Sequence, residues 1–446
     1  MRALLVLYLV APPGRGGVGF SDSTAIAVYG LFISSVYLAA LPGGWIADRW
    51  LGPVPAIWLG GLMMIAGNLL LTVPPDLIPV PCGLALFVAG VGLLRPNLTQ
   101  LLGRAAREES LQLDSAFTIF YVALNVGGLL GPLIASVMAA RSGWRVGFCV
   151  CTLGMLLGLA VFSRVSWRAP LARAPFRLRH AGCALLLMGT LALIAVYVPA
   201  VQLVRWAFAV ALLVALLTFA ALLRGAHERT ERSNMWALFG LFVGASVFWA
   251  ADEQAGASLT LLAQRFTNRT MSGFQFPAAW YQSLFPFYVV LIAPVFAWGW
   301  QVLSRRGVAQ STSLKFCAGL ALGALALTVA RSSLFPLSET GASPAWLALT
   351  YLLIALGEIL INPTGLAAVS RLAPKGRTGL ATGLWYLSLS LGGLSAGVTG
   401  GIYDLTTRAG LASTLLLISV VLSVASAVFL LVSVRSAQLR KMGLDI

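Results

Sequence analysis

The chain has 446 residues, of which 59% are hydrophobic and only 10% are charged. Soluble domains carry about a quarter charged residues, so this composition excludes an ordinary soluble protein. Apolar runs of about 20 residues recur along the whole length, and a helix of that length crosses a bilayer core. The composition therefore predicts an all-α protein that crosses the lipid bilayer many times.

The formal net charge of +16 would suggest a nucleic-acid partner in a soluble protein. In a membrane protein, arginine-rich cytoplasmic loops explain it more simply, so we expect no nucleic acid. The five cysteines show no disulfide or metal spacing, and His180 and His227 lie in polar loops. Nothing resembles a nucleotide site, a nucleophile triad or a metal-ligand cluster. We therefore predict neither an enzyme nor a cofactor nor a metal site.

Apolar runs predict about fourteen spans in the order six, two, six. They cover 1–10, 23–46, 54–73, 81–103, 115–139, 145–162, 181–199, 203–223, 236–262, 278–302, 313–331, 345–369, 378–400 and 411–434. This order is typical of the major facilitator fold, in which two six-helix bundles enclose a midplane site. We predict an N-terminal bundle over 1–162, a cytoplasmic linker with two extra helices over 163–234, and a C-terminal bundle with a basic tail over 235–446.

Arginine-rich loops set the predicted orientation. If the spans alternate, the loops around 163–180, 224–234, 304–307 and 371–377 and the tail after 434 lie on one side, with most of the 30 Lys and Arg residues. The positive-inside rule makes that side cytoplasmic. We expect a multi-pass protein of the inner (plasma) membrane with both termini in the cytoplasm.

The first predicted span, MRALLVLYLV, is unusually short. At 1.5 Å per residue it reaches about 15 Å, roughly half of a bilayer core. Either this helix has half the usual length, or the chain lacks its beginning. A cleavable signal peptide is the third interpretation, although no small-x-small cleavage site precedes the loop.

We single out five charged residues in predicted spans, because charge there is costly and usually faces a cavity. They are Arg2, Arg95, Asp252, Glu253 and Glu358. Four of them also have a simpler interpretation, whereas Arg2 is hard to judge because it stands at the start of the chain. Asp252 and Glu253 would merely mark a helix end, Glu358 would bond a neighbouring helix, and Arg95 would extend to the cytoplasmic interface.

Two glycine-containing motifs stand out. In GGWIADRWLG, Gly43 and Gly44 allow close helix approach, and Asp48 and Arg49 lie in a cytoplasmic turn where an inner gate is expected. A plain positive-inside turn is the alternative.

In FYVALNVGGLLGP, Asn125 is an amide in an apolar helix. It is a candidate ligand for a substrate amine or carbonyl, and helix packing is the alternative. Four aromatic residues are candidates for pocket walls, although packing and interface positions are commoner for aromatics in spans: Tyr37, Trp249, Trp385 and Tyr386.

Together these motifs resemble the proton-dependent oligopeptide transporter family of the major facilitator superfamily. GGWIADRWLG and FYVALNVGGLLG resemble its two signatures. FWAADEQAG resembles the seventh-helix motif, and GEILINPTGL followed by RLAP resembles that of the tenth helix. The extra helix pair is typical of bacterial members. The resemblance implies symport of di- and tripeptides with protons by alternating access, in a monomer.

The resemblance also implies residue roles. Glu358 matches the acid that receives the peptide amino terminus, helped by Asn125. Arg95 stands where relatives have a lysine tied to the peptide carboxylate and to coupling. Glu253 matches an acid that pairs with a first-helix arginine, here Arg2, at the outer gate. The four aromatic residues match pocket-lining positions.

Three departures leave alternatives open. The family's Glu-x-x-Glu-Arg run, which contributes to coupling, is absent upstream of Met1. Arg95 replaces lysine, and Phe285 replaces a frequent asparagine. Asp252 is acidic in some relatives, so its part in coupling is less defined. The chain is thus a peptide symporter, a transporter of another small anion or zwitterion, or a truncated inactive protein. Competition by dipeptides separates the first two.

The short first span generates a testable expectation. The in-frame DNA upstream of Met1 should encode about 10–25 further residues, since a full span needs that much more helix. They should include a Glu-x-x-Glu-Arg run, and the extended protein should couple dipeptide uptake to protons. Sequencing the locus tests this, and an in-frame stop immediately upstream without an alternative start would contradict it.

Overall fold

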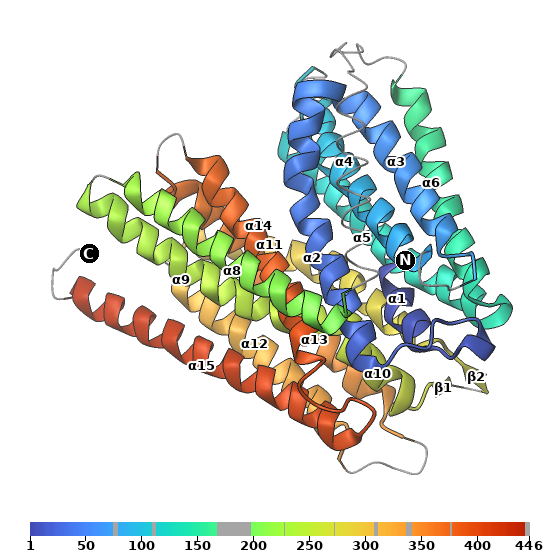
Figure 1. The fold of residues 1–446 in the computed structure, drawn as a ribbon. Helices are drawn as coiled ribbons and strands as arrows, with labels where there is room; N and C mark the ends of the chain where they lie inside the picture. The colour runs from blue at the N-terminus through green and yellow to red at the C-terminus, as the bar shows by residue number, and fades with distance from the viewer. Residues whose placement is uncertain are drawn as a thin grey trace. The chain divides into compact units, whose positions relative to one another are not determined.

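The computed structural model describes residues 1–74, 79–108, 113–166, 198–226, 228–271, 273–306, 311–335, 341–374 and 377–441. This part of the chain is mainly helical (Figure 1). Within it, 11 helical segments are long and apolar enough to cross a membrane. The prediction of a multi-pass helical membrane protein is therefore confirmed. The predicted span 181–199 lies outside the described residues, apart from its last two positions.

The chain divides into two units, Met1–Arg205 and Trp206–Ile446, which we describe separately. The predicted boundaries at 162 and 234 stay predictions. In the first unit, the elements in chain order are α1 (Arg2–Val10), a 3₁₀ turn (Pro13–Arg15), α2 (Asp22–Ile46), a π-helical turn (Ala47–Leu51), α3 (Pro53–Leu70), α4 (Pro79–Glu108), α5 (Leu113–Ser142) and α6 (Trp144–Ser166).

The boundary between the units falls within α8 (Ala200–Arg224). The second unit continues with α9 (Arg229–Asp252), a 3₁₀ turn (Glu253–Gly256), α10 (Ser258–Arg265), the hairpin strands β1 (Thr270–Met271) and β2 (Phe274–Gln275), a 3₁₀ turn (Ala278–Trp280), α11 (Tyr281–Arg305), α12 (Thr312–Ser332), α13 (Pro344–Leu372), α14 (Thr378–Thr399) and α15 (Arg408–Lys441).

Glycines bring helices of the first unit together. A Cβ added at Gly60 of α3 would lie 2.6 Å from the carbonyl oxygen of Gly90 on α4. A Cβ added at Gly43 of α2 would collide with the carbonyl of Gly92, also on α4. Helices in lipid associate through such close packing because no hydrophobic effect drives them together. α2 and α4 therefore approach closely at Gly43, whereas a Cβ at Gly44 would lie 3.8 Å from Pro96, at ordinary contact distance.

Small polar side chains join helices of the second unit. α12 and α15 run side by side (Figure 1). Ser419 of α15 donates from Oγ to the carbonyl oxygen of Ala324 on α12 at 3.0 Å. Ser426 donates in the same way to Cys317 at 2.9 Å. Hydrogen bonds of this kind hold transmembrane helices together in the absence of water.

The predicted span 236–262 is long and apolar enough to cross a membrane, but it is not one α-helix. α9 ends at Asp252, a 3₁₀ turn follows, and α10 starts at Ser258. The break frees the carbonyl of Ala255, which accepts hydrogen bonds from Thr260 Oγ1 at 2.8 Å and from Tyr351 Oη of α13 at 3.0 Å. Side chains that replace lost backbone partners make a break tolerable at membrane depth.

The short helix α1 packs within the first unit. Its side chains from Ala3 to Leu9 are buried. Arg2 donates from Nε to the hydroxyl of Tyr29 on α2 at 2.8 Å, and its guanidinium lies 5.9 Å from the centre of the Tyr29 ring. Tyr8 has its hydroxyl buried as well, but without a hydrogen-bond partner among the described residues. Two buried tyrosines therefore differ in whether their hydroxyl groups are bonded.

Gly43→Ala should lower the free energy of unfolding by about 1–3 kcal/mol, because the new methyl group pushes α2 from the backbone of α4. Gly44→Ala is the matched control, since a methyl group there meets Pro96 at ordinary contact distance. Thermal unfolding of both variants in detergent gives the comparison. Equal melting temperatures for the two variants would contradict the assigned contact.

Tyr29→Phe should destabilise the protein by about 1–3 kcal/mol, because it removes the acceptor of a charged hydrogen bond. Tyr8→Phe should leave the melting temperature unchanged or raise it, because the Tyr8 hydroxyl has no hydrogen-bond partner among the described residues. The two variants are measured side by side in the same detergent. If the melting temperature falls as much in Tyr8→Phe as in Tyr29→Phe, the Tyr8 hydroxyl does have a hydrogen-bond partner.

Candidate functional site

The predicted gate loop ties the α2–α3 turn to α4. Asp48 and Arg49 are exposed on the π-helical turn. Asp48 accepts a hydrogen bond through Oδ1 from Gln100 Nε2 on α4 at 3.2 Å, while the Arg49 guanidinium lies 5.5 Å from the centre of the Trp45 ring. Asp48 thus connects the turn to α4, and Gln100 is a partner that the motif did not reveal.

Asn125 is half-buried on α5 and donates from Nδ2 to the carbonyl of Tyr121 at 2.9 Å, within its own helix. A Cβ at Gly127 would meet nothing within 4 Å, so this glycine does not serve a close helix contact. The packing interpretation therefore gains no support from this glycine. Arg95 is exposed on α4, and Tyr37 is half-buried on α2.

Glu358 is half-buried in the middle of α13. Its Oε1 accepts a hydrogen bond from Nδ2 of Asn362, one turn later, at 3.1 Å. This bond orients the carboxylate from within its own helix. Asn362 was not predicted as a site residue, although it stands in the same GEILINPTGL motif, four positions after the acid.

Asp252 and Glu253 lie where α9 ends, and both are buried, with 7% and 0% of their surfaces exposed. Both residues do lie at a helix end, as the simpler interpretation expects. It does not explain their burial, because the C-terminal end of a helix carries partial negative charge and disfavours carboxylates. A buried acid pair at such an end requires compensation, and its role in coupling stays a prediction.

The predicted aromatic residues differ in their surroundings. Trp249 and Trp385 are 4% and 2% exposed, and each packs against a glycine, Gly392 and Gly365 respectively. The indole Nε1–H of Trp249 is buried without a hydrogen-bond partner among the described residues. Tyr386 is 42% exposed. The packing interpretation describes the surroundings of Trp385 best.

The five charged candidate residues fall in both units. Arg2 and Arg95 belong to the first unit, and Asp252, Glu253 and Glu358 belong to the second. The predicted pairing of Arg2 with Glu253 joins one residue of each unit and stays a prediction.

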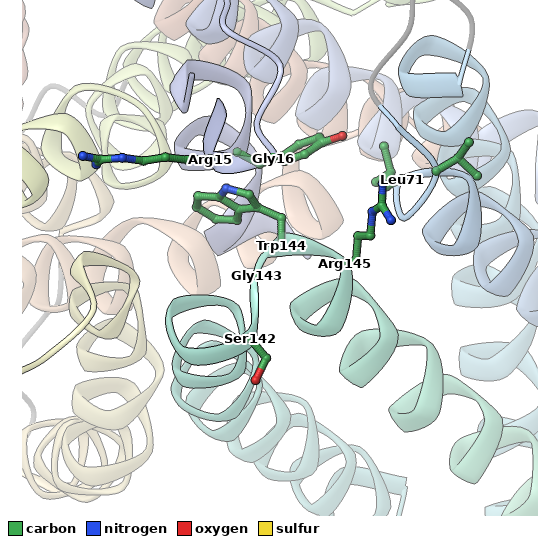
Figure 2. A pocket seen from close by; sticks show the side chains of 9 residues that line it. Arg15, Gly16, Leu71, Ser142, Gly143, Trp144 and Arg145 are labelled. Atoms are coloured by element: carbon green, nitrogen blue, oxygen red, sulfur yellow. The ribbon is translucent and has the colours of Figure 1, made fainter. Parts of the chain in front are cut away.

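A small cavity of about 190 Å³ lies at one end of the first unit (Figure 2). Its walls come from α1, the 3₁₀ turn after it, the end of α3 and the α5–α6 turn, and contain none of the predicted site residues: Tyr8, Arg15, Gly16, Leu71, Val73, Ser142, Gly143, Trp144 and Arg145. Figure 2 shows the side chains of Arg15 and Arg145 extending in different directions. Its charges therefore do not converge on a common ligand position.

Three proteins of known sequence are similar to this chain over most of its length. The uncharacterized transporter YclF of Bacillus subtilis is 32% identical over 435 residues, which cover 95% of this chain and 88% of that protein. The peptide transporter YePEPT of Yersinia enterocolitica is 32% identical over 434 residues, covering 90% and 84%. A di-/tripeptide transporter of Lactococcus lactis is 30% identical over 412 residues, covering 87% and 82%.

Solved structures and a family model agree with these relatives. A crystal structure of a peptide transporter POT, in mutant form with alafosfalin bound, has a TM-score of 0.87 and 29% identity, and the match covers 98% of this chain and 91% of that one. The predicted major facilitator fold is thereby confirmed. The family model described as POT family matches residues 55–416. Because these matches span most of the sequence, the chain belongs to the POT family of transporters.

Proposed function

We propose that the chain is a symporter that imports di- and tripeptides together with protons by alternating access. The observation that carries the proposal is membership of the POT family, together with 30% identity to a di-/tripeptide transporter over 412 residues. The second relative, from Yersinia enterocolitica, is also named as a peptide transporter. The protein then needs no cofactor and is not an enzyme, because the proton gradient supplies the driving force.

The residue roles that the POT family implies favour a zwitterionic substrate. Glu358 receives the peptide ammonium group, and its orientation by Asn362 prepares it for that bond. Arg95 receives the carboxylate, for which a guanidinium fork is well suited. Asn125 and Trp249 add donors at the walls, Trp249 through its unbonded indole N–H. Charge-assisted bonds are about twice as strong as neutral ones, so two of them fix both ends of a short peptide.

Glu253 is the proposed proton-coupling acid. It is fully buried at the break between α9 and α10, where a carboxylate is costly without a cation. Arg2 supplies that cation when the outer gate is closed. Protonation of Glu253 removes the attraction and releases the gate. Asp252, buried next to it, adds a second acid to the same helix end.

We place the protein in the plasma membrane as a monomer with cytoplasmic termini. The arginine-rich loops support this orientation because the positive-inside rule retains such loops on the cytoplasmic side. Asp48 and Arg49 of the gate loop then lie at the inner mouth, where the bond from Gln100 to Asp48 joins α4 to the turn.

A second candidate is transport of another small anion or zwitterion. It is favoured by Phe285, which is half-buried on α11 where relatives often have asparagine, and by Arg95 in place of lysine. An apolar side chain removes one amine contact, while a permanent cation favours carboxylates. Competition experiments with dipeptides, single amino acids and small carboxylates distinguish this candidate from the first.

Glu358→Gln should abolish uptake of labelled dialanine into proteoliposomes with an inward proton gradient, because the amide cannot form an ion pair with the peptide ammonium. An N-acetylated dipeptide, which lacks the ammonium group, should inhibit dialanine uptake by the wild-type protein only weakly. Glu228→Gln, at an exposed acid before α9, is the control and should transport normally. Normal dialanine uptake by Glu358→Gln would overturn the assignment, and competition only by non-peptide anions would favour the second candidate.

A further inference from the structure

Arg377 joins the ends of two helices. Its backbone begins α14, since its N–H donates to the carbonyl of Pro374 at 3.0 Å and its own carbonyl accepts from Ala381 N–H at 3.1 Å. Its side chain donates from Nη1 to the carbonyl of Ala221, in the last turn of α8, at 2.6 Å. One residue therefore begins one helix and caps another that lies more than 150 positions earlier.

The bond from Arg377 gives the Ala221 carbonyl a partner that α8 itself does not provide. In a continuing α-helix the N–H of Gly225 would donate to this carbonyl, but it donates to Leu222 at 3.1 Å instead. The last carbonyls of a helix need outside partners, and a cation is favoured there by the helix dipole. Arg377 meets both requirements at once.

Gly225 makes room for the guanidinium. A Cβ at this position would collide with Cζ and Nη1 of Arg377. The glycine is not among those with positive φ, so alanine fits its backbone, and only the arginine must move. Gly225→Ala is thus a way to remove the cap while Arg377 itself stays intact.

Other residues also hold the two capped ends: Leu222 of α8 and Ala381 of α14 are buried, and Arg232 of α9 donates from Nε to the carbonyl of Ala226 at 3.2 Å. Near the start of α14, a Cβ at Gly379 or Gly383 would meet nothing within 4 Å. Near the end of α8, the ring of Phe219 lies 5.2 Å from Trp236 and 4.5 Å from Phe239 on α9.

Away from that end, α8 is open on one side. Large apolar side chains follow each other at helical spacing along this face, and more than half of the surface of each is exposed: Trp206, Val210, Leu213 and Leu217. The bond from Arg377 is a direct hydrogen bond between α8 and the start of α14.

We propose that α8 acts as a brace for the helices of the second unit. Arg377 is the positioning residue that fixes the first turn of α14 to α8. The proposal rests on the proposed transport function. α14 carries Trp385 and packs through Gly392 against Trp249, so a displaced first turn changes how this helix moves during the transport cycle. The brace affects the rate of conformational change and leaves the substrate contacts in place.

The test measures kcat and KM for proton-driven dialanine uptake in proteoliposomes. Arg377→Ala and Gly225→Ala should each lower kcat about threefold to tenfold, with KM changed by less than about twofold. The double variant should match the single ones, since both remove the same bond. Arg377→Lys should recover part of the rate. Arg224→Ala, an exposed arginine in the same last turn, and Gly379→Ala are the controls and should transport like the wild type.

If the losses of kcat in the two single variants multiply in the double variant, or if Arg224→Ala loses as much kcat, the proposed brace is wrong. Hydrogen–deuterium exchange provides a readout that does not depend on transport. Amides in the last turn of α8 and the first turn of α14 should exchange faster in Arg377→Ala and in Gly225→Ala. If the wild type takes up no peptide, the proposed function fails while this exchange result still decides whether the bond exists. Unchanged exchange at both ends would refute the proposal.

Discussion

A peptide carbonyl in the hydrocarbon core must have a partner, because no water is available to it. The break between α9 and α10 shows how the second unit meets this constraint. Ala255 loses its place in a regular helix, and Thr260 and Tyr351 bond its carbonyl instead. The break sets Asp252 at the end of one helix and buries Glu253 in the turn that follows. The proposed proton-coupling position thus depends on a tyrosine that stands a hundred residues further along the chain.

The same constraint explains what could be predicted from sequence. Spans follow from hydropathy, since only long apolar helices satisfy their own backbone in lipid, and the predicted spans within the described residues agree with helices. The break at Glu253 did not follow, because its stability comes from Tyr351 on another helix. Likewise the motif contained Glu358, but the bond from Asn362 depends on side-chain geometry that spacing alone does not give.

Glycine positions show a similar limit. Gly43 and Gly44 look equivalent in the sequence, yet only Gly43 faces the backbone of α4. In the FYVALNVGGLLGP motif, a Cβ at Gly127 would meet nothing within 4 Å. Gly225, in a polar loop without a motif, is the one pressed against a guanidinium. The direction in which a glycine points depends on helix rotation, which packing determines, so a pair of glycines predicts close approach without saying which of the two provides it.

The pairing of α12 with α15 has a consequence for how the protein is made. Ser419 and Ser426 reach the backbone of α12 from the last helix of the chain, which is synthesised about 100 residues later. While the ribosome completes the intervening helices, the side of α12 that will receive α15 has to be shielded by lipid, by the insertion machinery or by a chaperone. Assembly of this unit is therefore completed only after translation of its final helix, and a chain released early exposes an unfinished face to membrane quality control.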